Sequence, residues 1–424
     1  MDTIFALSSG APPAAIAVVR ISGPRAGHAL ERLAGKLPAP RRAHLGRLRA
    51  ADGTLLDEAL VLWFPGPKSE TGEDCAELQL HGGRAVVDAV CTELATIEGL
   101  RPAEAGEFTR RAFANGRIDL LQVEGLADLV SAETELQRRA AMGLAGGSLS
   151  RQVEDWRERL LLLSARVEAV LDFEDEADVP GLDADFANGV KDLAADLSTA
   201  LDAPHAETLR EGYRVALAGP PNSGKSTLFN RLLEEEAAIV SPTAGTTRDV
   251  LVRNFALDGV PFTLVDMAGL REAGEDAIEV IGIGRAREEL ARADCVLWLG
   301  PEGQGPDGAW EIEARIDCSD SEAKLAPRFR VSAVTGEGIG ALCRALVGEA
   351  RGAMAVPGRT ALARRQRELI GEALQALGAG CEERDPLIVA EHLRLARSAF
   401  DRLTGRAATE DMLDALFSRF CIGK

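Results

Sequence analysis

The chain has 424 residues, a length that is sufficient for several domains with buried cores. Hydrophobic residues make up 46% of it and charged residues 27%, which is ordinary for a protein that folds in water. Its net charge of −19 makes it a poor general binder of phosphate backbones, so a nucleic acid would need a local basic patch or a partner protein.

The cysteines and the N-terminus indicate a cytoplasmic protein. Seven cysteines are scattered along the chain without a C-x-x-C pair, which favours a reducing compartment over a disulfide framework or a zinc site. The apolar N-terminus imitates a signal peptide, but Asp2, the missing basic flank and Pro12-Pro13 argue against one, and we expect two short strands there. No apolar run is long enough for a membrane span, so we expect no membrane association.

Hydrophobic periodicity divides the chain into segments of different character. Residues 1–117 mix strand patterns, such as AIAVVRIS and EALVLWF, with helical spacing in RAVVDAVCTELATI, and this mixture predicts an α+β domain. Residues 118–210 have apolar positions at three-and-four spacing, which predicts long helices over 119–144 and 153–173. Strands and helices alternate over 211–350, which is typical of a parallel sheet. Helical spacing returns over 351–424, so the α/β domain is expected to interrupt a helical one.

The stretch GPPNSGKST contains the phosphate-loop pattern G-x-x-x-x-G-K-S from Gly219 to Ser226. It follows the strand-like YRVALAG and opens a helical segment, and this context makes the motif specific. We expect backbone amides to hold the phosphates, Lys225 to reach the outer phosphates and Ser226 to hold Mg²⁺. A chance glycine-rich turn is the other interpretation.

Two further motifs follow in the order that switch GTPases use. AGTTRD offers Thr247 to Mg²⁺ and the γ-phosphate, and FTLVDMAG ends a strand at Asp266, with Gly269 three residues on. Each motif alone is weak, but together they indicate a GTPase. The residue after Gly269 is Leu270, which cannot orient water, so another residue must assist the attack.

The guanine-reading motif departs from Asn-Lys-x-Asp. In EARID the Asn position is Ala314 and the Lys position is Arg315, so Asp317 alone remains to accept from guanine. Arg315 has an aliphatic stem that could cover the base. Ser332 and Ala333 follow another predicted strand and could offer an amide to the guanine oxygen. We expect GTP with loosened selectivity, although EARID could be merely the end of a strand.

At this point the chain resembles the tRNA modification GTPase family MnmE, also called TrmE, over essentially its whole length. The motifs that carry the resemblance are AVVRISGP, TGEDCAELQLHGG, GEFTRRAFANGRIDLLQVEGLADL, GPPNSGKSTLFNRL, AIVSPTAGTTRDV, DMAGLREA, EVIGIGRA and FCIGK. The resemblance implies a homodimer with an N-terminal folate-binding and dimerisation domain (1–117), a helical domain in two parts (118–210 and 351–424) and an inserted G domain (211–350).

The resemblance also implies the parts of the catalytic site. K⁺ acts in place of an arginine finger, with Asn222, Ser241, Thr243 and Thr246 at the ligand positions, and Ser226 and Thr247 hold Mg²⁺. Glu279 falls at the position of a general acid/base, although its neighbourhood would also suit a solvated charge. The expected nucleotide-binding residues are Asn222, Ser223, Gly224, Lys225, Ser226, Thr227, Ser241, Pro242, Thr243, Ala244, Gly245, Thr246, Thr247, Asp266, Met267, Ala268, Gly269, Asp317, Ser332 and Ala333.

A folate site is implied in the N-terminal domain for 5,10-methylene- or 5-formyl-tetrahydrofolate. Arg20, Glu77 and Arg117 fall at contact positions with Lys424 near the same pocket, and Arg117 stands where the family has Lys. Without the resemblance these residues would be interpreted as surface charges. Cys421 in FCIGK is a catalytic candidate, although a free cysteine is often only a small hydrophobic residue.

The implied reaction needs an MnmG-type flavoprotein that uses FAD and NADH, in a heterotetramer or a larger complex. Together the two proteins modify the 5-position of the wobble uridine of certain tRNAs, with a one-carbon unit from folate and an amine from glycine or ammonium. Two alternatives stay open: an RNA- or ribosome-assembly switch GTPase without modification activity, and a folate-dependent scaffold whose G domain has lost guanine selectivity. A stand-alone ATPase fits Asp317 less well.

Overall fold

The computed structural model describes residues 2–172, 182–202, 206–234, 251–267, 289–318, 323–354, 361–418 and 420–424. The chain forms two compact units: Met1–Ala127 with Ala145–Val153 and Phe400–Lys424, and Asp128–Leu144 with Glu154–Ala399. The domain boundaries after residues 117, 210 and 350 stay predictions. No helix of these ranges is long and apolar enough to cross a membrane.

The first unit is built on a six-stranded sheet in the order β3-β4-β5-β2-β1-β6. Neighbouring strands are antiparallel, except for the parallel pair β1 and β6. The two strands expected at the N-terminus are confirmed as β1 and β2. The strands are β1 (Thr3–Leu7), β2 (Ile16–Ser22), β3 (His44–Arg49), β4 (Leu55–Phe64), β5 (Cys75–His81) and β6 (Leu100–Pro102).

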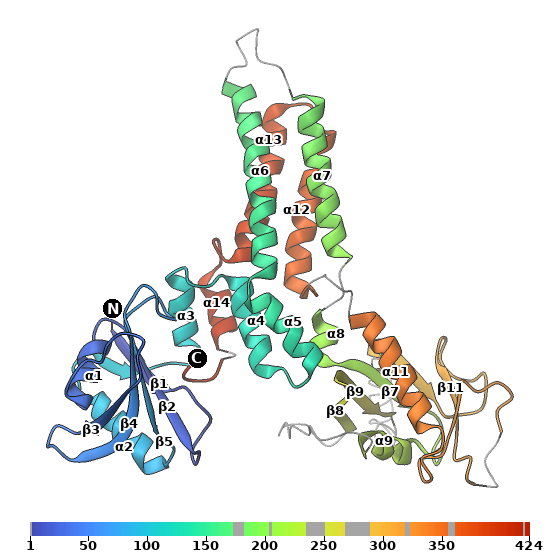
Figure 1. The fold of residues 1–424 in the computed structure, drawn as a ribbon. Helices are drawn as coiled ribbons and strands as arrows, with labels where there is room; N and C mark the ends of the chain where they lie inside the picture. Colours follow the sequence, from blue (N-terminus) through green and yellow to red (C-terminus); the bar gives the residue numbers. More distant parts are fainter. Residues whose placement is uncertain are drawn as a thin grey trace, which may run out of the picture. The chain divides into compact units, whose positions relative to one another are not determined.

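Helices cover both faces of this sheet (Figure 1). α1 (Ala26–Ala34) and α2 (Arg84–Ala95) pack on one face, where apolar positions at three-and-four spacing, such as Leu30 and Leu33, are buried. α3 (Glu107–Ala114) packs Phe108 against the other face. The sheet faces therefore differ: one is apolar, and the other carries the polar residues of the predicted folate site.

The end of the chain joins this unit. α4 (Leu120–Ser131) and α14 (Glu410–Phe417) share a cluster of buried residues with Phe420, and Arg110 on α3 forms ion pairs with two carboxylates of α14. Near the C-terminus, Ile422 forms a bridge with Ala105. Residues 105–110 therefore pack with residues 410–418 and 420–422.

The helix expected over 119–144 is two helices, α4 and α5 (Glu135–Ala145). The Thr134 hydroxyl accepts from the Gln137 amide, while the Gln137 side chain accepts from the Thr134 amide. This capping box starts a new helix, and its T-x-x-Q pattern is visible in the sequence.

Four long helices form a bundle in the second unit (Figure 1). Arg159 of α6 pairs with Asp196 of α7 at 2.5 Å, and Arg367 of α12 donates to the carbonyl of Leu201, the last residue of α7. Gly380 of α12 has no side chain, which allows α13 to approach closely. The helices are α6 (Ser148–Asp172), α7 (Ala184–Leu201), α12 (Arg364–Glu382) and α13 (Pro386–Thr404). The helical spacing of the sequence predicted α6, α12 and α13.

The α/β part has a second six-stranded sheet in the order β12-β11-β10-β7-β9-β8. Its strands are β7 (Tyr213–Ala218), β8 (Leu251–Leu257), β9 (Val260–Asp266), β10 (Cys295–Trp298), β11 (Trp310–Ala314) and β12 (Phe329–Val331). Its helices in the described ranges are α8 (Ala206–Glu211), α9 (Lys225–Glu234) and α11 (Ile339–Met354).

The prediction of a parallel sheet is wrong for one strand. β8 runs antiparallel to β9, because only Asp258 and Gly259 separate them, and both have positive φ (49° and 74°). An Asp-Gly turn of this kind makes a hairpin, and so short a connection can join only antiparallel strands. The other five strands are parallel, so their carboxyl ends meet at one edge.

We predict that Gly106→Ala loosens the contact between α3 and α14. Gly106 has φ +70°, and an added Cβ would lie 2.3 Å from the Phe417 carbonyl oxygen. Gly116→Ala is the matched control, because its φ is +64° but its Cβ would meet nothing within 4 Å. A left-handed alanine costs roughly 1–2 kcal/mol in either variant. Hydrogen exchange of residues 410–418 should be markedly faster in Gly106→Ala alone, and equal exchange in both variants would contradict the expected clash.

Candidate functional site

The phosphate loop connects β7 to α9 at the edge where the parallel strands end. Gly219 and Gly224 have φ of +150° and +93°, which favours glycine, and Asn222 has φ +62°. The loop therefore turns sharply into the amino end of α9, whose amides point toward any group held there. This arrangement is an anion site of the kind that binds phosphates.

Lys225, the first residue of α9, reaches back across the loop. Its side chain is 5% exposed, and Nζ donates to the Pro220 carbonyl at 2.6 Å. The ammonium thus lies on the phosphate-binding side of the loop. A bound phosphate can take the place of that carbonyl as its acceptor.

Ser226 at the start of α9 and Asp266 at the end of β9 meet beside the loop. The Ser226 hydroxyl donates to Asp266 Oδ2 at 3.1 Å, and Asp266, the last residue of β9, is 1% exposed. A hydroxyl and a carboxylate are the hard oxygen ligands that Mg²⁺ prefers, so this pair fits the ion that the motif implies. Met267, the next residue, is also buried.

The strand-end motif EARID lies beside the same loop. β11 ends at Ala314, Arg315 has φ +60°, and its guanidinium donates to the Asn222 carbonyl at 3.2 Å. Sequence reasoning expected Arg315 to cover the base but missed this contact with the loop. A positive φ on arginine has no sequence signal.

Asp317 and Ser332, which the sequence predicts to meet the base, are joined by a hydrogen bond. The Ser332 hydroxyl accepts from the Thr335 amide at 3.0 Å and donates to Asp317, and this hydrogen bond is the main cause that holds the pKa of Asp317 below its usual value. The Ser332 amide donates to the Glu337 carbonyl, so Ala333 is the remaining candidate of this pair for an amide that meets the base. Asp317 is exposed and ionised, as a guanine acceptor should be.

Several predicted residues lie outside the described ranges. They are Ser241, Pro242, Thr243, Ala244, Gly245, Thr246, Thr247, Ala268, Gly269 and Glu279. The assignments to them stay predictions.

The predicted folate residues Arg20 and Glu77 are brought together. They are register partners on β2 and β5, and Arg20 Nη2 lies 3.0 Å from Glu77 Oε1. Arg20 Nη1 also pairs with Glu70 Oε2 at 2.6 Å. The side chains of Arg20 and Glu77 are 18% and 21% exposed, so a ligand can reach both donor and acceptor.

Arg117 joins this group through the chain segment that carries Glu70. Its Nε donates to the Ser69 carbonyl at 3.1 Å, next to the residue that pairs with Arg20. Sequence reasoning missed Glu70 and Ser69, although they immediately precede a motif that it singled out. Nothing in their residue types marks them as partners of Arg20 and Arg117.

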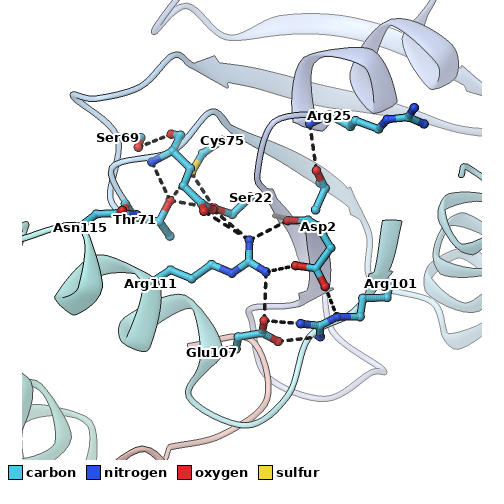
Figure 2. Close-up of polar contacts among 12 residues, drawn as sticks. Asp2, Ser22, Arg25, Ser69, Thr71, Cys75, Arg101, Glu107, Arg111 and Asn115 are labelled. Carbon is cyan, nitrogen blue, oxygen red and sulfur yellow. Dashed lines mark hydrogen bonds and ion pairs between the residues drawn. The ribbon is translucent and has the colours of Figure 1, made fainter. Parts of the chain in front are cut away.

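A polar network around Arg111 holds the segment that carries Ser69, Glu70 and Glu73 (Figure 2). Arg111 of α3 contacts Asp2, Glu73 and Glu107 at 2.8, 3.1 and 3.0 Å, and its side chain is 13% exposed. Burial alone would raise the pKa of Glu107, but hydrogen bonds from Arg101, the Glu104 amide and Arg111 lower it below its usual value. Glu107 is therefore held in its ionised form by the arginines around it.

The C-terminal residues lie along β1. Gly423 approaches the Leu7 carbonyl so closely that a Cβ would lie 2.0 Å from it, and Leu7 is next to Ala6, the register partner of Arg20. The Lys424 amide donates to the Cys421 carbonyl at 3.2 Å. Cys421 is exposed, which leaves its thiol accessible.

The loop, the Ser226–Asp266 pair and the acidic strand end define a P-loop protein of the GTPase class. Models of the MnmE helical domain and of the GTP-binding protein TrmE N-terminus match residues 120–421 and 3–117. The chain belongs to the tRNA modification GTPase MnmE family, so the resemblance and the expected fold class are confirmed, as is the class of enzyme, a GTP hydrolase.

Relatives match over the whole chain. The tRNA modification GTPases MnmE of Erythrobacter litoralis (strain HTCC2594) and Novosphingobium aromaticivorans are 62% and 59% identical, with all of each chain covered. That of Rhizorhabdus wittichii is 57% identical over all of this chain and 97% of its own. Among solved structures, the G domain of the T. maritima FeoB iron transporter covers 32% of this chain and 98% of its own, with 26% identity and a TM-score of 0.24.

We predict that Ser332→Ala raises the pKa of Asp317 toward its usual value of 3.8, because the variant removes the hydrogen bond that most favours the carboxylate. A group with a lowered pKa contributes stabilisation above its usual pKa and loses it as the pH falls, so the effect is confined to acid pH below about 4. NMR titration of the Asp317 carboxyl in both proteins measures the shift. An unchanged titration would show that Ser332 does not hold Asp317.

Proposed function

We propose that the chain is a K⁺- and Mg²⁺-dependent GTP hydrolase that works with an MnmG-type flavoprotein carrying FAD and NADH. Together they add a carboxymethylaminomethyl-type group to the 5-position of the wobble uridine of certain tRNAs. The convergence of Lys225, Ser226 and Asp266 beside the phosphate loop is the observation that carries the hydrolase. The printed name of the full-length relatives supports the tRNA modification.

In this proposal the chain's own residues bind and orient the triphosphate. Amides of the loop and of α9 donate to phosphate oxygens, and Lys225 exchanges the Pro220 carbonyl for the outer phosphates. Ser226, with Thr247 as the proposed second ligand, holds Mg²⁺, and Asp266 orients Ser226. Mg²⁺ held by these residues would supply positive charge to the phosphate oxygens.

A potassium site completes the proposal. Asn222, Ser241, Thr243 and Thr246 are the proposed ligands, and Glu279 is the proposed general acid/base. Asn222 is exposed, so its amide oxygen is available as a hard ligand next to the phosphate loop. The cation supplies fixed positive charge where the transition state gains negative charge.

The N-terminal part is proposed to bind 5,10-methylene- or 5-formyl-tetrahydrofolate. Arg20, Glu77, Arg117 and Lys424 are the proposed contacts, and the accessible Arg20–Glu77 pair supports them, since it offers donors to glutamyl carboxylates and an acceptor to the pterin. Cys421 is a candidate catalytic residue, and its exposure agrees with that role.

The proposed partners follow from the family and the charge. The chain forms a homodimer whose G domains meet on GTP binding, within a heterotetramer or larger complex in the cytoplasm. A net charge of −19 favours a flavoprotein partner that makes most of the tRNA contacts. The proposed domains are residues 1–117, 118–210 with 351–424, and 211–350.

We predict that the purified chain hydrolyses GTP faster than ATP, and GTP at least about tenfold faster in K⁺ than in Na⁺. Asn222→Ala should abolish the advantage of K⁺, because it removes a proposed ligand. Asn230→Ala is the matched control, since Asn230 is also exposed, on α9 of the same loop-helix unit. Phosphate release in the four nucleotide–salt combinations measures both effects.

The outcomes separate the open alternatives. Equal turnover of GTP and ATP would mean that EARID no longer selects guanine. Indifference to the cation would contradict the assignment of Asn222. A K⁺-stimulated GTPase without folate binding would favour the assembly GTPase.

We predict that Arg20→Gln weakens binding of 5-formyl-tetrahydrofolate by about 1.5–3 kcal/mol, roughly ten- to a hundredfold in Kd. The variant removes the charge but keeps a polar side chain on the same strand. Arg47→Gln is the control, because Arg47 forms an exposed pair with Glu58 on β3 and β4 of the same sheet. Calorimetry measures Kd, and equal affinities of the two variants would remove Arg20 from the site.

A further inference from the structure

Arg20 already pairs with a carboxylate of the chain itself at the end of its guanidinium. Its Nη1 lies 2.6 Å from Glu70 Oε2, while its Nε and Nη2 contact Glu77 Oε1 at 3.1 and 3.0 Å. The single positive charge of Arg20 is therefore shared by two carboxylates. A ligand's carboxylate that approaches this end of the guanidinium has to displace Glu70 or lie beside it, where like charges repel.

Glu77 and Phe108 are sufficient to orient the guanidinium. Glu77 is the register partner of Arg20 on β5 and accepts from two of its nitrogens. The guanidinium carbon of Arg20 lies 5.8 Å from the centre of the Phe108 ring, and Phe108 is 1% exposed. Glu70 adds a third contact, so the direction of Arg20 is set without it.

The backbone of Glu70 is held in place by its two neighbours, whereas its side chain can turn. Ser69 and Thr71 are 4% and 0% exposed. Arg117 Nε donates to the Ser69 carbonyl at 3.1 Å. On the other side, Asn115 Nδ2 donates to the Thr71 carbonyl at 2.8 Å (Figure 2). Because the Glu70 side chain is 57% exposed, a change of rotamer is enough to move its carboxylate from Arg20 into water.

We propose that Glu70 is an internal competitor for the carboxylate of an anionic folate, and that it sets the affinity of this site for such a ligand. Glu70 holds the end of the Arg20 guanidinium until the glutamyl carboxylate of the ligand takes its place. The pair is partly exposed, so breaking it costs little and a ligand can displace Glu70. This inference rests on the proposed folate site and concerns a residue outside the proposed contacts.

Removal of the charge of Glu70 separates competition from positioning. Glu70→Gln keeps the length and polarity of the side chain but removes its charge. Glu58→Gln is the matched control, because Glu58 is also an exposed glutamate, and it pairs with Arg47 on β4 and β3 of the same sheet. If Glu70 competes with the ligand, its neutralisation strengthens binding of an anionic folate, whereas a glutamate that positions Arg20 would weaken binding when it is neutralised. The sign of the effect therefore decides between the two roles.

The first experiment measures by calorimetry the Kd of 5-formyl-tetrahydrofolate for the full chain. We expect Glu70→Gln to lower Kd about three- to tenfold, because a partly exposed ion pair no longer has to be broken and a like charge is removed. Glu58→Gln should stay within about twofold of the unchanged chain. An equal or higher Kd in Glu70→Gln would overturn the competition and leave the folate site in place. Absence of binding in both the unchanged chain and Glu70→Gln would remove the folate site, and the inference with it.

The second experiment completes a double-mutant cycle with Arg20→Gln. In the chain that carries Arg20→Gln, the further change Glu70→Gln should alter Kd by less than about twofold, because the guanidinium for which Glu70 competes is gone. Glu58→Gln in the same background is the control. A gain as large as that in the unchanged background would show that Glu70 only repels anions in general, and the proposal would be wrong.

Discussion

The nucleotide site depends on how closely the phosphate loop can approach the neighbouring strand ends. A Cβ on Gly219 would lie 3.1 Å from the Gly300 amide nitrogen beyond β10, and one on Gly224 would lie 3.2 Å from Arg315 beyond β11. The loop is thus held on two sides by segments that follow parallel strands. Because it cannot spread, Lys225 folds back over it, and Ser226 at the start of α9 reaches Asp266 at the end of β9. The site therefore results from the parallel arrangement of the strands together with glycine, which has no side chain, at positions 219 and 224.

The N-terminal part depends on a different constraint, the ion pairs that surround Arg111. Arg111 is surrounded by carboxylates, and hydrogen bonds from Arg101 and Arg111 lower the pKa of Asp2 and Glu107 although burial opposes their charge. Since the pKa of Asp2 and of Glu107 is lowered, this network contributes stability above their usual pKa values and loses it as the pH falls below them. The segment fixed by the network presents Glu70 to Arg20. An anionic ligand on Arg20 therefore meets a guanidinium that is oriented in advance by carboxylates.

Local patterns predicted most of this fold, and long-range geometry explains what they missed. The phosphate loop, β7, β9 and the long helices are encoded by contiguous residues, and the capping box at Thr134 was also readable. The Asp-Gly turn carried a hairpin signal that the alternation of strands and helices concealed. In contrast, the contact of Arg315 with Asn222 depends on two backbones with positive φ that are far apart in sequence. The pairing of Glu70 with Arg20 likewise depends on a connecting segment whose path no periodicity describes.

The replacement of Asn-Lys-x-Asp by Ala-Arg-Ile-Asp in EARID changes where guanine selectivity can arise. Asp317 is exposed in this structure. While water can still hydrogen-bond to its carboxylate, an adenine bound beside it would lose little binding free energy relative to guanine. With Asp317 as the proposed acceptor, selectivity would arise when a bound base shields Asp317 from water, because an acceptor that is cut off from water and left unmatched costs about 1–3 kcal/mol. Ser332 takes up part of the hydrogen-bonding capacity of Asp317 and keeps it charged, which strengthens its preference for a base edge that donates. With Asp317 as the proposed guanine acceptor, selectivity would depend on how well the loop and the bound base shield Asp317 from water, more than on the number of polar groups in the motif.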